Sequence, residues 1–311
     1  MKKVRLALIG AGRWGKNIIK TLDALPECEL AYQATHDWRT LLEKSDIDGV
    51  LIATPTSTHA EIALPFIERG LPVFIEKPFT TSLADAKRLQ KAAEESGSII
   101  FVGHLHLYNP PYLAIKKLLP TIGRVRWIYA EGANNGPYRD DMSALWDWAP
   151  HDIALMLDML GSLPLRVQAF SALLLRPAAH LDDIAFIKLE FPNRAVGFIF
   201  NSWLFPEKRK KVSIIGKKSS IVFDDTAEKK IALYEHMGPE VAGNAVTRNE
   251  PSISYPPYGD EKSLALELKA FLRTILEKEK PLSGVAEGLD VVAVLDAAER
   301  SISAGGTVIA L

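Results

Sequence analysis

The chain has 311 residues, which is enough to bury a large core and is typical of two domains. Lys and Arg number 37 against 38 Asp and Glu, so the chain has no excess of positive charge with which to bind nucleic acid or an anionic membrane. The only cysteine, Cys28, excludes an internal disulfide and a thiolate metal cage, and it favours a reducing compartment. We expect a cytoplasmic protein with a small-molecule partner and no metal.

The first apolar stretch, "VRLALIGAG", is only as long as a strand and runs into glycines and Arg13. A signal peptide would instead lead to a cleavage site with small residues, so we expect no targeting segment. No run of about 18 apolar residues occurs, and we expect no membrane span.

From residue 4 to about 118, short apolar runs alternate with helical patterns. The apolar runs are "VRLALIG", "ELAYQA", "GVLIAT", "PVFIEK" and "SIIFVG". The helical stretches lie near 13–23, 58–69, 82–95 and 109–118. Apolar runs this continuous suit strands buried on both faces, as in a parallel sheet with crossover helices. The pattern predicts a doubly wound α/β domain, a Rossmann fold, over residues 1–120.

The pattern changes after Gly123, where longer segments follow in which polar and apolar residues tend to alternate. These segments are "RVRWIYAEG", "RVQAFSALLL", "DIAFIKLEF", "AVGFIFNSWLF", "KKVSIIG" and "SSIVFDD". Alternating polar and apolar residues predict a mostly antiparallel sheet with one buried face. Helices are expected at 261–278 and 284–304, and a long loop at 237–260. We expect an α+β domain over residues 121–311.

The motif "IGAGRWG" directly follows the first predicted strand and precedes a helix. Its Gly-x-Gly-x-x-Gly spacing allows a tight turn, close approach of the backbone to a pyrophosphate, and close packing of helix on strand. The phosphate charge would lie at the helix N-terminus, where free N–H groups favour it. The expected cofactor-binding residues here are Gly10, Gly12, Arg13, Trp14 and Gly15. The alternative reading is a tight turn without a ligand.

The position expected to bind the adenosine ribose is irregular. A carboxylate at the end of the second strand would indicate NAD, but this strand ends at Thr35, followed by His36 and Asp37. Thr35 would not repel a 2′-phosphate and His36 could attract one, whereas Asp37 could still reach the ribose. We expect NAD or NADP as cofactor, with NADP accepted at least as readily.

Two further stretches end predicted parallel strands, where ligands of such sheets bind. The stretch "IATPTSTH" would line the cofactor with Thr54, Pro55 and His59. The stretch "FIEKPF" would bring Glu76, Lys77 and Pro78 to the nicotinamide end. For this second stretch the alternative is a solvated lysine followed by a proline that begins a helix. His104 and His106 flank Leu105 at a later strand end, and one of them could line the pocket.

In the second half, "LWDWAPHD" places Asp147 four residues before His151. Pro150 fits best as the first helical residue, which would put Asp147 just before a helix and His151 in its first turn. The preceding stretch is polar and rich in turn residues. Candidate substrate contacts are Asn135, Tyr138, Arg139 and Trp148, each of which could equally serve loop structure or core packing.

The motifs "GAGRWG", "ATPTSTHAE", "EKP" and "YNPPY", followed by Asp-x-x-x-His, resemble the family of glucose-fructose oxidoreductase, inositol dehydrogenase and rhizopine catabolism oxidoreductases. The resemblance runs nearly the full chain. It implies a Rossmann domain, a C-terminal domain on a large open sheet, and hydride transfer between a nicotinamide and a secondary alcohol of a sugar, sugar derivative or cyclitol. Thr35 departs from the aspartate of many members, and Leu107 departs from a common arginine.

The resemblance assigns the catalytic roles. Lys77 matches the lysine beside the nicotinamide and the reacting hydroxyl, His151 matches the acid/base, and Asp147 matches the acid that accompanies it. Alcohol oxidation releases a proton as well as a hydride, and a histidine changes charge near neutral pH. Two alternatives remain: a non-catalytic dinucleotide-binding sensor or subunit on the same fold, and reduction of another carbonyl or imine. A half-exposed sheet also suggests a homodimer or homotetramer.

Overall fold

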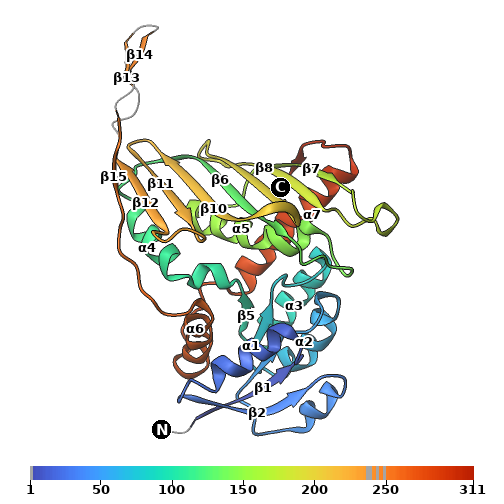
Figure 1. Ribbon diagram of the computed structural model, residues 1–311. Helices are drawn as coiled ribbons and strands as arrows, with labels where there is room; N and C mark the ends of the chain where they lie inside the picture. The colour runs from blue at the N-terminus through green and yellow to red at the C-terminus, as the bar shows by residue number, and fades with distance from the viewer. Residues whose placement is uncertain (1–2, 236–239, 243–244, 248–249) are drawn as a thin grey trace. The chain divides into compact units, whose positions relative to one another are not determined.

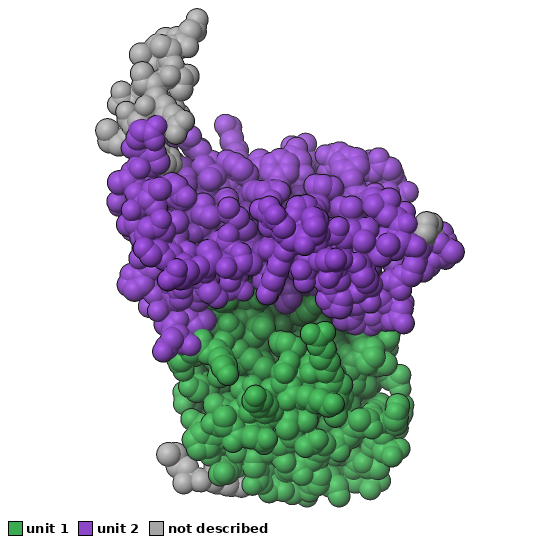
Figure 2. Space-filling model, viewed as in Figure 1, with its two compact units in different colours: residues 1–109, 261–293 green, residues 110–260, 294–311 purple. Residues whose placement is uncertain are grey.

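The computed structural model describes residues 3–235, 240–242, 245–247 and 250–311. The chain forms two compact units, drawn in green and purple in Figure 2. Unit 1 comprises residues 1–109 and 261–293, and unit 2 comprises residues 110–260 and 294–311. The predicted division into 1–120 and 121–311 placed residues 261–293 with the second domain, whereas they pack in unit 1.

Unit 1 is built on a five-stranded parallel sheet with strand order β2-β1-β3-β4-β5. Its strands are β1 Val4–Ile9, β2 Cys28–Ala34, β3 Gly49–Ile52, β4 Val73–Glu76 and β5 Ile100–Gly103. The last three are buried along their whole length, as continuous apolar runs require. The order, in which the chain moves outward from β1 in both directions, confirms the doubly wound α/β fold.

Helices and short 3-10 turns connect these strands (Figure 1). The helices are α1 Arg13–Leu22, α2 His59–Ile67 and α3 Leu83–Ser96, and the turns are η1 Trp38–Glu43, η2 Thr56–Thr58 and η3 Leu105–Tyr108. The three helices confirm the predicted ranges within a residue or two. Helix α3 begins after Ser82, whose side chain accepts the Asp85 N–H at 3.1 Å, as an N-cap should.

Helix α6, Ser263–Glu277, completes the core of unit 1 although it is distant in sequence. The ring of Phe271 lies 5.7 Å from the rings of both Phe74 and Phe101, edge to face, and is fully buried. Such contacts combine apolar burial with favourable ring geometry. They bring the helix predicted at 261–278 against β4 and β5.

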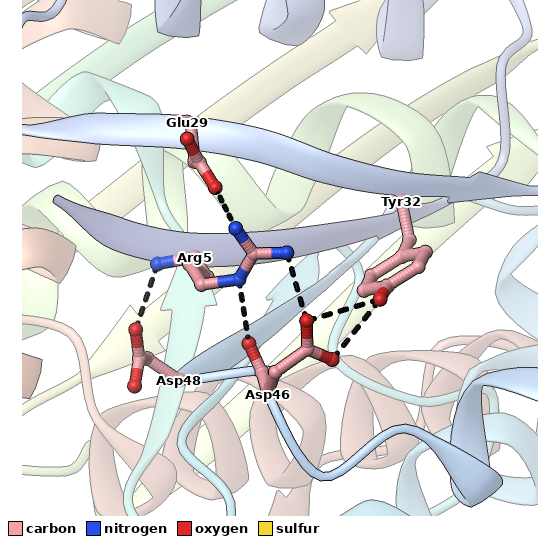
Figure 3. Close-up of polar contacts among 5 residues, drawn as sticks. All are labelled: Arg5, Glu29, Tyr32, Asp46 and Asp48. Carbon is pink, nitrogen blue, oxygen red and sulfur yellow. Dashed lines mark hydrogen bonds and ion pairs between the residues drawn. The ribbon is translucent and has the colours of Figure 1, made fainter.

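Unit 1 also holds an ionic network at the amino ends of its first strands (Figure 3). The Arg5 guanidinium donates to Glu29 and to the Asp46 carboxylate at 2.8 Å, while the Arg5 N–H donates to Asp48 at 2.8 Å. The Tyr32 hydroxyl donates to Asp46 at 3.0 Å. The network links β1, β2 and the loop before β3. It lies at the amino ends of these strands, whereas the glycine fingerprint follows the carboxyl end of β1.

Unit 2 is built on a nine-stranded sheet with order β15-β12-β11-β10-β6-β9-β8-β7-β16. The strands are β6 Val125–Asn135, β7 Arg166–Ala172, β8 Ile184–Glu190, β9 Val196–Ser202, β10 Leu204–Gly216, β11 Ser219–Asp224, β12 Ile231–Glu235, β15 Ser252–Ser254 and β16 Ile309–Ala310. All neighbours are antiparallel except β6 and β9. This confirms the large, mostly antiparallel sheet.

Helices α4, Pro110–Leu118, and α5, Ala144–Leu160, lie with the last turns of α7, Val285–Ser303, on one face of this sheet (Figure 1). Side chains of β8 alternate, with Ala185, Ile187 and Leu189 buried and Phe186 exposed. The period of two follows from the pleat, which turns successive side chains to opposite faces. The 3-10 turn η4, Pro177–Ala179, lies in the β7–β8 connection.

Two sequence expectations need correction. The loop expected at 237–260 contains a hairpin, β13 Glu240–Ala242 and β14 Ala245–Thr247, as well as β15; the intervening 237–239, 243–244 and 248–249 lie outside the described residues. The segment "AVGFIFNSWLF" contains all of β9 and the start of β10 rather than one strand. Among the described residues, no helix combines the length and apolar character needed to cross a membrane.

Candidate active site

The glycine fingerprint forms a turn that only glycine can adopt. Gly10 follows β1 with φ +100°, and a Cβ built there would lie 2.5 Å from the Ala53 carbonyl oxygen. A Cβ on Gly15 would lie 2.0 Å from the Gly10 carbonyl oxygen. Side chains at both positions would collide with backbone, so these two glycines are required by the fold itself.

Gly12 is different, because a Cβ built there meets nothing within 4 Å. It is the N-cap of α1, and no side chain caps this helix end. The first N–H groups of a helix need partners, and together with the helix dipole they favour an anion. The open space at Gly12 and the uncapped helix therefore fit the pyrophosphate of a dinucleotide. Arg13 and Trp14, the first two residues of α1, are exposed beside it.

The first two residues after β2 bear no carboxylate. Thr35 and His36 are exposed directly after the strand, followed by exposed Asp37. Arg39 pairs with Glu61 at 2.6 Å and lies over the Trp38 ring at 4.3 Å. Thr35 and His36 thus offer a hydroxyl and an imidazole to a ribose or its phosphate, and the Asp37 carboxylate comes one residue later.

His59 is fully buried at the start of α2. Its Nδ1 lies 3.0 Å from the Pro78 carbonyl oxygen and its Nε2 lies 2.9 Å from the Thr54 carbonyl oxygen. Burial lowers the pKa of His59, although the two carbonyls act in the opposite direction. His59 therefore ties the turn after β3 to the turn after β4. Thr54 accepts the Thr58 hydroxyl at 2.8 Å, and Pro55 is exposed.

Glu76 ends β4, and the Glu-Lys-Pro turn follows it. The Glu76 side chain is 8% exposed, accepts from the Trp14 indole N–H, and accepts from the Lys77 N–H at 3.2 Å. Burial raises the pKa of Glu76 to about 7, opposed by Trp14 and by the Lys77 charge. Pro78 is buried in the turn and α3 begins only at Leu83, so the alternative reading of a helix-starting proline is wrong.

Asp147 and His151 lie on helix α5 of unit 2. The helix begins at Ala144 and Ser143 is its N-cap, accepting the Trp146 N–H at 3.4 Å. Both site residues are therefore inside the helix, one turn apart on one face. The prediction that Pro150 begins the helix is wrong, because the cap at Ser143 supplies an earlier start and the helix continues through the proline.

The expected substrate contacts lie near this helix in unit 2. Arg139 binds the Asp141 carboxylate at 2.6 and 2.8 Å, and its guanidinium lies 3.6 Å from Asp147. Tyr138 donates to Asn135, and both are exposed. Trp148 is partly buried, and its ring carbon Cε3 would lie 3.1 Å from a Cβ on Gly132. Arg139 thus contacts helix α5 through Asp147, and Trp148 packs against β6.

Several buried polar residues escaped the sequence reasoning. Asp152, next to His151, accepts from the Asn201 side chain at 2.9 Å, and burial raises its pKa to about 6, opposed by Asn201 and by the charge of Lys210. In unit 1, Glu267 of α6 is buried as well, as is His104 before η3, which the sequence had already singled out. Glu267 interrupts an apolar stripe, which is the one signal that could have pointed to it.

Comparisons with known proteins identify the family of both halves of the chain. A family model described as "Oxidoreductase family, NAD-binding Rossmann fold" matches residues 20–104. The model of the GFO/IDH/MocA C-terminal domain matches residues 112–222. The two matches follow one another along the chain in the order that the sequence motifs imply.

A solved structure of an oxidoreductase from Magnetospirillum magnetotacticum MS-1 is similar over 95% of this chain and 99% of its own, with 32% identity and a TM-score of 0.84. An inositol 2-dehydrogenase from Rhizobium meliloti (strain 1021) is 24% identical over 96% of this chain and 97% of its length. A scyllo-inositol 2-dehydrogenase (NAD(+)) from Bacillus subtilis (strain 168) is 26% identical over 76% of this chain and 78% of its length. The chain belongs to the GFO/IDH/MocA family of NAD(P)-dependent oxidoreductases.

Proposed function

We propose that this oxidoreductase transfers a hydride between a nicotinamide and a secondary alcohol or ketone of a sugar, a sugar derivative or a cyclitol. The observation that carries the proposal is the pair Asp147 and His151, one turn apart on α5, in a chain whose Lys77 directly follows Glu76, the acid that accepts the indole N–H of Trp14 from the glycine fingerprint. The inositol dehydrogenases among its relatives support this substrate class.

In this proposal three residues carry the chemistry. The bound nicotinamide supplies the hydride acceptor. His151 takes the hydroxyl proton, because its ordinary pKa of about 6.5 suits proton exchange near neutral pH. Asp147, one turn away, favours the charged imidazole, and the Lys77 ammonium stabilises negative charge on the substrate oxygen. Gly12 and the α1 N-terminus hold the cofactor pyrophosphate.

Substrate recognition is proposed for the polar stretch before α5. Asn135 and Tyr138 are exposed and offer an amide and a hydroxyl to sugar hydroxyls. Arg139 could bind an acidic group on a sugar acid or nucleotide sugar only by exchanging Asp141, to which it is bidentate. Trp148 offers an aromatic ring to the apolar face of a sugar ring.

We further propose that NADP is accepted at least as readily as NAD. Thr35 and His36 stand exposed where a carboxylate would repel a 2′-phosphate. Titration of the purified protein with each cofactor, followed by the intrinsic tryptophan fluorescence, tests this proposal. A clear preference for NAD would contradict it.

The exposed face of the unit 2 sheet supports a homodimer or homotetramer. Phe170, Phe186 and Phe198, on the neighbouring strands β7, β8 and β9, are 51%, 52% and 41% exposed. Contiguous exposed apolar side chains are typical of protein interfaces. The single cysteine, Cys28, is buried, which suits a reducing compartment such as the cytoplasm.

The decisive experiment screens sugars, sugar acids, cyclitols and nucleotide sugars with both cofactors by absorbance of the reduced nicotinamide. His151→Asn should reduce kcat on the best substrate by about 10²- to 10⁴-fold while cofactor affinity persists. Full turnover by His151→Asn with cofactor bound would overturn the acid/base assignment. Tight cofactor binding without turnover across the panel would favour the non-catalytic alternative.

A further inference from the structure

Helix α6 carries a buried acid toward the carboxyl ends of β4 and β5. Phe271 fixes the placement of the helix, because its ring packs on Phe74 and Phe101. Glu267 lies one turn before Phe271 and so shares its inward face. Its side chain is fully buried. An apolar residue would be the ordinary choice at this position, so the carboxyl group needs a reason.

Glu267 faces the acid at the end of β4. The negative charge of Glu76 reaches Glu267 and adds to the effect of burial, so that the pKa of Glu267 is raised well above its ordinary value. The Glu76 carboxyl lies against β5, since a Cβ on Gly103 would be 3.1 Å from Glu76 Oε2. Both acids, the strands that bury them and the Glu-Lys-Pro turn belong to unit 1.

The polar atoms around this pair are unusually short of partners. Neither carboxyl oxygen of Glu267 has a hydrogen-bond partner within the described part of the chain. The same holds, across those residues, for both ring nitrogens of His104, which is 1% exposed and directly follows Gly103. Buried polar groups are nearly always paired, with protein or with water, so a cluster of this kind marks a place where protons or water are handled.

An ionised carboxylate cannot remain buried without partners, because losing its hydration costs far more than binding a proton. Glu267 is therefore the member that keeps its proton. Glu76 can ionise, because the Trp14 indole and the Lys77 backbone N–H donate to it. Burial lowers the pKa of His104 to about 4, helped by the Lys77 charge, so that this ring is neutral.

We propose that Glu76 and Glu267 form a buried carboxyl pair that holds one proton in the resting enzyme and takes up a second during alcohol oxidation, as a proton store that serves Lys77. The inference rests on the proposed dehydrogenase function. The groups that act on the pair are Trp14 from α1 and Lys77 after β4, both on Glu76, and Tyr108 from η3, which Glu267 influences; the Lys77 charge also reaches His104 after β5. Burial raises the pKa of Glu76 to about 7, so that this carboxyl group can gain or lose a proton near neutral pH.

The proton balance of the step is simple. In oxidation, the substrate carbon gives its hydride to the nicotinamide and the hydroxyl gives its proton to His151. Once the substrate oxygen has lost its negative charge, the Lys77 ammonium passes one of its own protons to ionised Glu76, so that Lys77 becomes a neutral amine, Glu76 becomes a neutral acid and Glu267 keeps its own proton throughout. Reduction runs these transfers in reverse, and Glu76 returns the proton to Lys77 before the next oxidation.

The first test uses the cofactor-free protein, so that it does not depend on turnover. With ¹⁵N-labelled tryptophan, the indole resonance of Trp14, assigned with Trp14→Phe, should titrate with a midpoint at about pH 7. Glu76→Gln should abolish this titration. In infrared spectra at about pH 8, a protonated carboxyl band should be present in the wild type and absent in Glu267→Gln. A Trp14 resonance that does not titrate, or a band that survives in Glu267→Gln, would overturn the pair.

The second test asks whether the pair serves catalysis. The oxidation rate of the wild type should rise through about pH 7 and the reduction rate should fall, with Glu76→Gln losing this component and at least about tenfold in kcat. Asp290→Asn, which removes another half-buried acid of unit 1, is the matched control and should leave the profile unchanged. A wild-type profile in Glu76→Gln would overturn the role of the store. If no substrate is turned over at all, the proposed function fails while the spectroscopic test still decides the pair.

Discussion

Charged side chains have opposite environments at the two ends of the unit 1 sheet. At the amino ends, Arg5, Glu29 and Asp46 form mutual ion pairs, and their side chains are 32%, 41% and 46% exposed. At the carboxyl ends, Glu76 and Glu267 are both buried, and burial together with the charge of Glu76 raises the pKa of Glu267. A partly exposed ionic network fixes strand register, whereas buried acids are tolerated where a site needs them.

The pKa shifts at the two ends also have opposite signs. Desolvation opposes the ionisation of Asp46, but hydrogen bonds from Tyr32 and Arg5 outweigh it and lower the pKa of this carboxyl. Burial raises the pKa of Glu76 and Glu267. The amino end is therefore most stable when ionised, and the carboxyl end when protonated. The sign of the pKa shift therefore distinguishes the ionic network at the amino ends from the buried acids at the carboxyl ends.

The sharpest test of the comparison removes the charge at the carboxyl end. Lys77→Met should reduce kcat by about 10²- to 10⁴-fold, because the substrate oxygen loses its electrostatic partner. The measurement is steady-state turnover at saturating cofactor and substrate. Lys87→Met, on the exposed face of α3, should keep wild-type turnover. Retained turnover in Lys77→Met would show that the Lys77 charge takes no part in the chemistry.

The pH dependence of stability tests the opposite signs directly. A raised folded-state pKa contributes stability that is complete below the unfolded value and is lost as pH rises through the folded value. For Glu76 the window runs from 4.5 to about 7, which corresponds to about 3 kcal/mol of unfolding free energy. Urea unfolding of the wild type and of Glu76→Gln should diverge over this window, with the wild type losing more stability.

The amino end provides the opposite case in the same experiment. The lowered pKa of Asp46 contributes stability that is present above its ordinary value of 3.8 and lost as the pH falls through the folded value. Asp46→Asn should therefore differ from the wild type least at acid pH. Parallel pH profiles for Glu76→Gln and Asp46→Asn would contradict the assignment of opposite signs.

Periodicity and turn chemistry were enough to predict the scaffold. The parallel strands of unit 1 are continuous apolar runs, and those of unit 2 alternate, so both sheets could be read from the residues. The start of α5 could not, because Pro150 looked like a helix start whereas the Ser143 cap lies seven residues earlier. The preference of proline for the first position of a helix was outweighed by the Ser143 N-cap and by the packing of α5 on β9 and β6.

The candidate site was predictable only in part. Gly12, Lys77 and His151 belong to local motifs, which a single sequence displays. Glu267 does not, because it lies about 190 residues after Glu76 and its meaning depends on how α6 packs on β4 and β5. Contacts between distant segments are what a periodicity argument cannot supply.

Gly12, near the carboxyl end of β1, is a position where a substitution should affect cofactor binding but not folding. Gly12→Ala should leave the unfolding free energy within about 0.5 kcal/mol, because the added methyl meets no atom. It should weaken cofactor binding at least about tenfold, because the methyl occupies the space where a pyrophosphate would approach. Fluorescence titration measures the affinity, and Lys20→Ala at the other end of α1 is the control. Unchanged affinity would mean that the α1 N-terminus does not hold the phosphates.

The smallest effect is expected at the amino end. Arg5→Gln removes the ion pairs with Glu29 and Asp46 but leaves the backbone N–H that binds Asp48. Partly exposed ion pairs contribute little and are screened by salt, so Tm should fall slightly at low ionic strength and hardly at all at high ionic strength. Arg88→Gln, which breaks the exposed pair with Asp85, provides the reference for a purely surface effect. Turnover and cofactor affinity should be unchanged, and a loss of either in a folded Arg5→Gln protein would show that the two ends of the sheet are coupled.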